Sequence, residues 1–279
     1  MKVLEERFAV HLDDYKHYDT EKLRKHFLVE SIFVADEVQF TYTHYERLMV
    51  GGVMPVNKSV QLETYDQLKM EFFLDRRELG AINIGGSGKV SVDGQVYEIG
   101  TKEALYIGRG AKEVFFSSDD AANPAKFYLN STPAHTTHPT KKVNKENSKV
   151  LHMGAGDTCN ERDIYQLMIS TVLDTCQLQM GMTELKPGSI WNTMPMHTHS
   201  RRMEAYFYFN IPDTHAVCHF MGPANETRHI WVGNEQAVVS PPWSMHSGVG
   251  TANYTFIWGM AGENMDYTDM DFHKPSELK

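Results

Sequence analysis

The chain has 279 residues, a length that corresponds to one or two domains of ordinary size. Apolar residues make up 41% of it and charged residues 23%, the balance of a globular protein with a sizeable core. Asp and Glu outnumber Lys and Arg by 36 to 27, so the formal net charge is −9, which argues against binding to the phosphate backbone of nucleic acids.

Targeting and cysteine features favour a cytoplasmic protein. No stretch of about 18 consecutive apolar residues is present, so no membrane-spanning helix is expected. The N-terminal residues MKVLEER carry too many charges for a secretory signal. The three cysteines, Cys159, Cys176 and Cys218, form no C-x-x-C pair, and an odd number cannot be fully bridged within one chain. Reduced thiols and a cytoplasmic location are therefore expected.

Residues 1–30 are expected to form a short helical or irregular arm. Asp19 or Thr20 can cap a helix, because their side-chain oxygens accept hydrogen bonds from the free backbone N–H groups of a first helical turn. Leu23, Phe27 and Leu28 would then lie on one apolar face.

Residues 31–134 have the pattern of short strands separated by turns. The clearest pair is 90–92 and 95–99, which flank Asp93-Gly94, a dipeptide typical of a tight hairpin. Turn signals at intervals of about 8–12 residues favour a β-sandwich or β-barrel.

The segment 135–150 is polar, contains Pro139 and is rich in lysine. It is expected to be a linker, although a connection of this length can also pack against a domain. The strand pattern returns in 151–279, where 204–210 has the pattern of one strand. The sequence therefore predicts an all-β protein with two β-barrels, 31–134 and 151–279, preceded by the helical arm.

A constellation of metal-ligand residues stands out in the second half. His197 and His199 are two residues apart, so in a strand their imidazoles point to the same face. Four residues then leave room for a tight turn before Glu204, which would open the neighbouring strand. His246 follows a Pro-Pro turn far along the chain and is the best candidate for a fourth ligand.

Three neutral imidazoles and one carboxylate suit a divalent transition metal such as Zn, Fe, Mn or Ni. The competing interpretation is a pair of exposed loop histidines, which accounts for most isolated H-x-H pairs. The glutamate at this offset, the late histidine and the all-β pattern together favour the metal site.

These motifs resemble a known family. H-x-H-x4-E followed by P-P-W-S-M-H resembles the metal motifs of cupin barrels, and nearly the whole chain resembles the bacterial 5-keto-4-deoxyuronate isomerases. The segments that carry the closer resemblance include Arg76–Gly80, Ile82–Gly86, Val92–Gln95, Gly110–Val114, Trp191–Pro195, Arg201–Glu204, Tyr206–Asn210, Glu226–Ile230 and His246–Gly250.

The resemblance implies a double cupin that binds one Zn²⁺ per subunit in its C-terminal barrel, through His197, His199, Glu204 and His246. It also implies a homohexamer that acts in the catabolism of pectin-derived uronates. The implied reaction converts 5-dehydro-4-deoxy-D-glucuronate to 3-deoxy-D-glycero-2,5-hexodiulosonate through a metal-stabilised enediolate. The first barrel has no H-x-H-x4-E motif and is expected to lack the metal.

The other site residues are less defined by the sequence. A ketol isomerisation needs a group that moves a proton, and Tyr206 shares the inward face of Glu204 if that strand alternates. Filling of the barrel interior is an equal alternative for this tyrosine. The substrate carboxylate calls for an arginine, and Arg162, Arg202 and Arg228 are candidates, each with a surface charge as its alternative.

Two other functions fit parts of the pattern. An iron cupin dioxygenase would use the same four ligands, and O₂ consumption would distinguish it. A non-catalytic sugar-sensing cupin would normally carry a basic DNA-binding helix pair, and no such segment is apparent. A small-molecule deoxyuronate therefore remains the expected partner, with no nucleic acid and no membrane.

Overall fold

The structure, a computed structural model, describes residues 4–263 and 267–279. The chain divides into two compact units. The first contains the residues up to Arg7, Ser31–Lys149 and Leu167–Gln179, and the second contains Phe8–Glu30, Val150–Gln166 and Met180–Lys279. None of the helices in the described ranges is long and apolar enough to cross a membrane.

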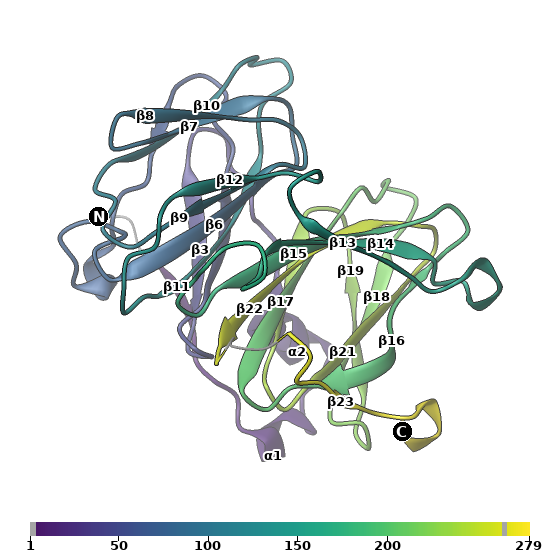
Figure 1. Cartoon of the computed structure of the whole chain (residues 1–279). Helices are drawn as coiled ribbons and strands as arrows, with labels where there is room; N and C mark the ends of the chain where they lie inside the picture. Colours follow the sequence, from purple (N-terminus) through teal and green to yellow (C-terminus); the bar gives the residue numbers. More distant parts are fainter. Residues whose placement is uncertain (1–3, 264–266) are drawn as a thin grey trace. The chain divides into compact units, whose positions relative to one another are not determined.

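The first unit consists of a seven-stranded and a four-stranded sheet (Figure 1). The larger sheet has the order β1 (Glu5–Arg7), β3 (Val38–Thr43), β4 (Met49–Val53), β11 (Phe127–Pro133), β6 (Arg77–Asn83), β9 (Ala104–Ile107) and β12 (Lys141–Val143). The smaller has the order β5 (Val60–Gln61), β10 (Val114–Ser118), β7 (Gly88–Val92) and β8 (Gln95–Ile99), and the 3-10 helix η1 is Asp66–Leu68.

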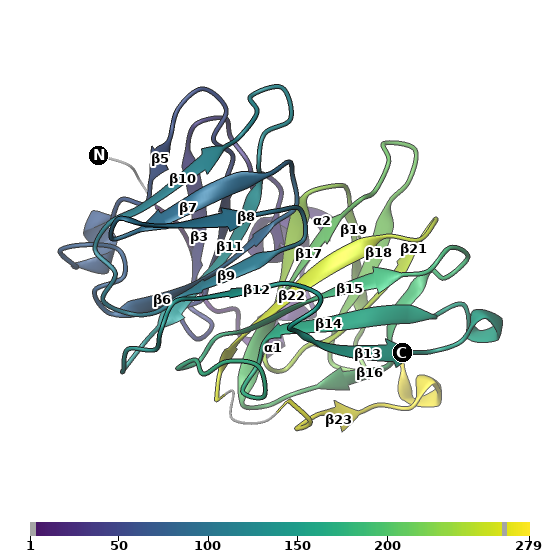
Figure 2. The same ribbon diagram turned by 45° about the horizontal axis from the view of Figure 1, so that its top comes forward.

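The second unit consists of a seven-stranded and a five-stranded sheet (Figure 2). The larger has the order β13 (Lys149–Met153), β14 (Arg162–Met168), β15 (Gln179–Leu185), β22 (Thr255–Gly262), β17 (Arg202–Phe209), β20 (Gln236–Ser240) and β2 (Leu28–Val29). The smaller has the order β19 (Arg228–Val232), β18 (Val217–Gly222), β21 (Met245–Gly250), β16 (Trp191–Thr198) and β23 (Asp271–Phe272). The helices are α1 (Leu12–Tyr15), α2 (Thr20–Phe27), η2 (Gly156–Thr158) and η3 (Pro275–Glu277).

The two units repeat one topology. In both large sheets the second to sixth strands occur in the same order, so that β6 of the first unit corresponds to β17 of the second. The small sheets correspond as well, β5-β10-β7-β8 to β16-β21-β18-β19. This confirms the predicted all-β, duplicated architecture. Each predicted barrel is built from two separate sheets, however, and not from one closed ladder of hydrogen bonds.

Local predictions near the N-terminus and at the first hairpin are confirmed. The Asp19 side chain accepts a hydrogen bond of 2.9 Å from the Lys22 backbone N–H and caps α2, which buries Leu23 and Phe27. Asp93 and Gly94 join β7 to β8 with φ angles of 47° and 86°, the left-handed pair that a two-residue hairpin of this kind requires.

The two segments that flank residues 31–134 in the sequence contain more regular secondary structure than their sequences indicate. The segment 135–150, expected to be a linker, contains β12, which pairs with β9. The segment 1–30, expected to be an arm, supplies β1 to the first unit and α1, α2 and β2 to the second. Short strands such as these carry no period of their own, because partner strands far away in the sequence define them.

A buried carboxylate on β6 connects the two neighbouring strands of the first unit to the loop that precedes β15. Both oxygens of Glu78 accept hydrogen bonds, from the hydroxyl groups of Tyr106 and Thr132 at 2.7 and 2.9 Å. They also accept from three consecutive backbone N–H groups at 2.7–2.8 Å, those of residues 176–178. Glu78 therefore fixes the loop that precedes β15.

We expect Glu78→Gln to lower the free energy of unfolding by about 2–3 kcal/mol, because the amide NH₂ would face buried donors where the carboxylate oxygen accepted from them. Urea denaturation measures this effect. The matched control is Glu98→Gln on exposed β8, which should change stability by less than about 0.5 kcal/mol. Equal losses in the two variants would contradict this role of Glu78.

Candidate metal centre

The four predicted metal ligands lie on the facing sheets of the second unit. His197 is near the end of β16 and His199 follows that strand, while His246 is the second residue of β21. β16 and β21 are neighbours, and His197 pairs in register with His246. Glu204 comes from β17 in the opposite sheet. Strand pairing within one sheet therefore brings together His197 and His246, 49 positions apart, and Glu204 reaches them from the other sheet.

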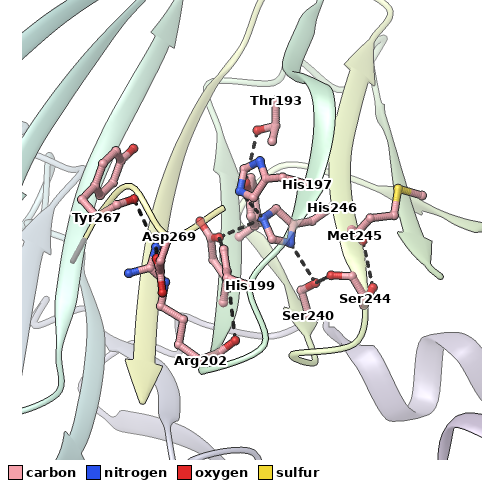
Figure 3. A network of polar contacts seen from close by, with 12 residues as sticks. Thr193, His197, His199, Arg202, Ser240, Ser244, Met245, His246, Tyr267 and Asp269 are labelled. Carbon is pink, nitrogen blue, oxygen red and sulfur yellow. Dashed lines mark hydrogen bonds and ion pairs between the residues drawn. The ribbon is translucent and has the colours of Figure 1, made fainter. Parts of the chain in front are cut away.

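The nitrogen and oxygen atoms of these side chains converge. One potential ligand atom from each of His197, His199, Glu204 and His246 lies within 4.8 Å of the others, and all four residues are buried. The Nε2 atoms of His199 and His246 both lie 3.0 Å from Glu204 Oε2, and the Nε2 atoms of His197 and His246 are 3.1 Å apart. Figure 3 shows the three imidazoles turned toward one another.

The outer contacts of the imidazoles determine which atoms face the centre. His199 Nδ1 lies 3.3 Å from the Arg202 backbone carbonyl, which can only accept a hydrogen bond, so this nitrogen carries a proton. In the neutral tautomer, His199 Nε2 then presents a lone pair toward the Glu204 carboxylate. His246 Nδ1 has a similar outer contact of 3.3 Å with the Ser240 hydroxyl. Lone pairs that face each other at such distances repel, and a divalent cation between them removes that repulsion.

The protonation equilibria agree with a metal-ligand set. Burial and the neighbouring His246 lower the pKa of His197 to about 2, so this imidazole stays neutral. Burial also lowers the pKa of His246. Burial opposes ionisation of Glu204, but the electrostatic interactions of its carboxylate with His246 and His199 outweigh burial and hold the pKa of Glu204 well below its usual range. Neutral His197 and His246 beside an ionised Glu204 are in the protonation states that metal coordination requires.

A cavity of about 230 Å³ adjoins the cluster. Arg202, Glu204 and Tyr206 alternate along β17, and all three line the cavity, as the predicted strand pattern requires. Trp258, on the neighbouring strand β22, extends the same wall of the cavity. Its ring occupies space that only a glycine at position 181 leaves free, since a Cβ there would lie 2.0 Å from the ring. The mostly apolar wall shields the cluster from bulk water.

The other predicted site residues fall in different places. Tyr206 lies in the cavity, and its hydroxyl shares a hydrogen bond of 3.2 Å with Thr193. Arg162 also lines the cavity, whereas Arg202 lines it with its guanidinium 2.6 Å from the Asp269 carboxylate. Arg228 does not line the cavity and instead pairs with Glu226 at 2.6 Å.

The sequence reasoning missed the C-terminal residues of the site. Tyr267, Met270 and Phe272 line the cavity, and Asp269 pairs with both Arg201 and Arg202, as seen in part in Figure 3. β23 adds to β16 beside His197. The signal was weak, because this segment shows neither a strand period nor a ligand motif, and only its docking onto β16 brings it to the site.

Comparisons with known proteins agree with this geometry. The model of the KduI/IolB family matches residues 27–277. A protein of Formosa agariphila named 4-deoxy-L-threo-5-hexosulose-uronate ketol-isomerase is 58% identical over 99% of this chain and 98% of its own. A protein of Bacteroides fragilis with the same name is 55% identical over 98% of both chains.

Among solved structures, an IolB-like protein from Salmonella typhimurium aligns with a TM-score of 0.72 at 14% identity and covers 88% of this chain and 96% of its own. An oxalate decarboxylase from Lactobacillus farciminis aligns with a TM-score of 0.57 at 12% identity, covering 81% and 79%. At these identities the likeness concerns the fold alone, and it supports the duplicated cupin architecture. From the family match and the two curated relatives together, the chain belongs to the KduI/IolB family and is an enzyme, a ketol-isomerase of the intramolecular oxidoreductase class.

Proposed function

We propose that this enzyme is a zinc-dependent isomerase of 5-dehydro-4-deoxy-D-glucuronate, which it converts to 3-deoxy-D-glycero-2,5-hexodiulosonate. The observation that carries the proposal is the convergence of three buried imidazoles and one carboxylate on a cavity. The names of relatives that are 55% and 58% identical over almost their whole length supply the substrate. The cavity volume suits a small open-chain sugar acid.

The donor set fits zinc. Three histidine nitrogens and one carboxylate oxygen are ligands that Zn²⁺ binds readily, and the reaction has no net redox change that would demand another metal. When bound, a divalent cation supplies Lewis acidity for the two oxygens on the carbons that exchange the carbonyl. His197, His199, Glu204 and His246 would hold it.

Arg162 is the group proposed to hold the substrate carboxylate. Its Nη1 donates to the Asn160 carbonyl at 2.7 Å, and among the described residues no carboxylate forms an ion pair with it. Burial lowers the pKa of Arg162, as expected for a cation partly removed from water. Arg202, in contrast, already has Asp269 as its partner. A planar guanidinium that remains available in the cavity matches the two oxygens of a carboxylate.

Tyr206 is proposed to donate a hydrogen bond or a proton to a substrate oxygen. Burial, together with the nearby Glu204 charge, raises the pKa of Tyr206 well above its ordinary value. The hydroxyl therefore stays protonated at neutral pH and acts as a donor and not as a base. Its ring packs 5.2 Å from that of His246, so the hydroxyl is held beside the cluster.

The cellular setting follows from the same resemblance and is part of the proposal. The enzyme would act in the cytoplasm on deoxyuronates released from pectin, as a homohexamer. Gel filtration with light scattering measures the assembly size directly.

Metal content provides the first test. His246→Ala and Glu204→Gln are expected to lose most of the bound zinc and at least about 100-fold in kcat/KM, because each removes a ligand. Plasma emission spectrometry and an isomerase assay measure the two quantities, and circular dichroism checks folding. The matched control is His229→Ala, an exposed histidine on β19, which should keep both metal and rate. Full isomerase rate in a metal-free variant would overturn the proposal, as would substrate-dependent O₂ consumption.

Arg162→Gln should raise KM by about 10- to 100-fold, because one charge-assisted contact to the substrate carboxylate is lost. Steady-state kinetics at saturating zinc measures the change. Arg228→Gln is the matched control, since it removes the same charge outside the cavity, and it should alter KM by less than about twofold. A larger effect for Arg228→Gln than for Arg162→Gln would assign the carboxylate contact elsewhere.

Tyr206→Phe should lower kcat by about 100-fold with little loss of bound zinc, because the ring remains in place while the donor is removed. The control is Tyr97→Phe on β8, which removes a hydroxyl group from the first unit and not from the unit that holds the cluster, and it should leave kcat unchanged. An unchanged kcat in Tyr206→Phe would contradict the donor role and would show that this tyrosine only packs in the cavity.

A further inference from the structure

The first unit contains a cavity of its own, with a volume of about 410 Å³. It lies where β3, β6 and β11 end or begin, next to η1, and its charged and aromatic lining residues are Glu6, Tyr42, His44, Arg47, Arg76 and Arg77. Three arginines against one glutamate make the lining basic, although the whole chain carries a formal charge of −9.

Arg77 is the unusual member of this lining. It is only 4% exposed, yet it faces the cavity. Its Nε donates to the Ser131 hydroxyl at 3.0 Å, and its Nη2 donates to the backbone carbonyls of Arg47 and Ser131 at 2.8 and 2.7 Å. Nη1 donates to none of the described residues. Three bonds thus fix the guanidinium rigidly and leave one pair of N–H donors uncommitted.

No carboxylate of the described residues forms an ion pair with Arg77. Burial lowers the pKa of Arg77 to about 10, which still leaves it protonated at neutral pH. The adjacent carboxylate of Glu78 already accepts five hydrogen bonds from other groups. A buried cation costs free energy unless an anion compensates it.

Two further side chains provide donors at the same cavity. Arg77 binds the Arg47 backbone carbonyl, while the exposed Arg47 guanidinium forms no hydrogen bond or ion pair with the described residues. The Tyr42 ring packs against the Arg77 guanidinium, 5.9 Å from its centre, and the Tyr42 hydroxyl has no hydrogen-bond partner among the described residues. The Arg76 guanidinium, in contrast, already donates a hydrogen bond of 2.6 Å to the Lys69 backbone carbonyl. Arg77, Arg47 and Tyr42 therefore present hydrogen-bond donors, two of them cationic, to one cavity.

We propose that this cavity is a second ligand site, for a small hydroxylated anion of monosaccharide size. Its carboxylate or phosphate group would bind Arg77 and Arg47, and its hydroxyl groups would reach Tyr42 and Glu6. The site is separate from the metal cluster, since every lining residue belongs to the first unit. At the third residue of β6, the place that Glu204 takes in β17, this unit has the buried Leu79.

Isothermal titration calorimetry of the full-length, zinc-loaded protein tests the proposal with three probes. D-galacturonate represents a carboxylate, inorganic phosphate represents a phosphate group, and D-galactose is the neutral counterpart. At least one anion should bind with a Kd below about 1 mM, and D-galactose should not. Which anion binds more tightly identifies the chemical group that the site recognises.

Variants assign the binding to this cavity. Arg47→Gln and Tyr42→Phe should each weaken anion binding, Arg47→Gln by about tenfold, because one charge-assisted contact is lost. The charge-matched control is Lys58→Gln, an exposed residue of the same unit outside the cavity, which should leave binding unchanged. Isomerase kcat should be normal in Arg47→Gln, which shows that the metal site is intact. Absence of anion binding, or binding that Arg47→Gln and Tyr42→Phe do not alter, would overturn the proposal.

Discussion

The second unit depends on one electrostatic constraint, the close approach of nitrogen and oxygen lone pairs in a buried place. Glu204 Oε2 lies 3.0 Å from two imidazole nitrogens, and a backbone carbonyl holds the proton of His199 on the far side of its ring. The lone pairs of these nitrogen and oxygen atoms repel one another unless a cation or a proton lies between them. The β-sheets thus hold these residues in an arrangement whose electrostatic repulsion costs free energy, and the binding of a cation or a proton offsets that cost.

The duplicated topology shows how one scaffold supports two different interiors. The corresponding strands β6 and β17 both begin with a buried arginine, Arg77 and Arg202. In the second unit Asp269 neutralises the arginine, and Glu204 follows two residues later. In the first unit Leu79 takes that later position within a hydrophobic core that includes the stacked rings of Phe40 and Phe73. The strand framework is the same, but the side chains on its inner faces determine the chemistry.

The accuracy of the sequence-based predictions varied with the range of the interactions involved. The Asp19 cap and the Asp93-Gly94 hairpin were predictable, because each depends on hydrogen bonds or dihedral angles within a few residues. The strands β2, β12 and β23 were not, because two or three residues become a strand only beside a distant partner. The three candidate arginines looked equivalent in the sequence, and only their partners in space separate Arg162 from Arg202 and Arg228.

The sequence by itself determined the fold class and the composition of the metal cluster. Alternating strands recur with turns between them. The spacing of His197 and His199 places their side chains on one face of their strand, and one turn later Glu204 can point toward the same interior. Only the tertiary structure decided which groups surround that cluster and which charges have no ion-pair partner among residues 4–263 and 267–279. Asp269 neutralises Arg202, while Arg162 and Arg77 keep donors that face cavities. The physical reason is that a side chain's direction follows from its own strand, whereas its partner depends on how the sheets pack.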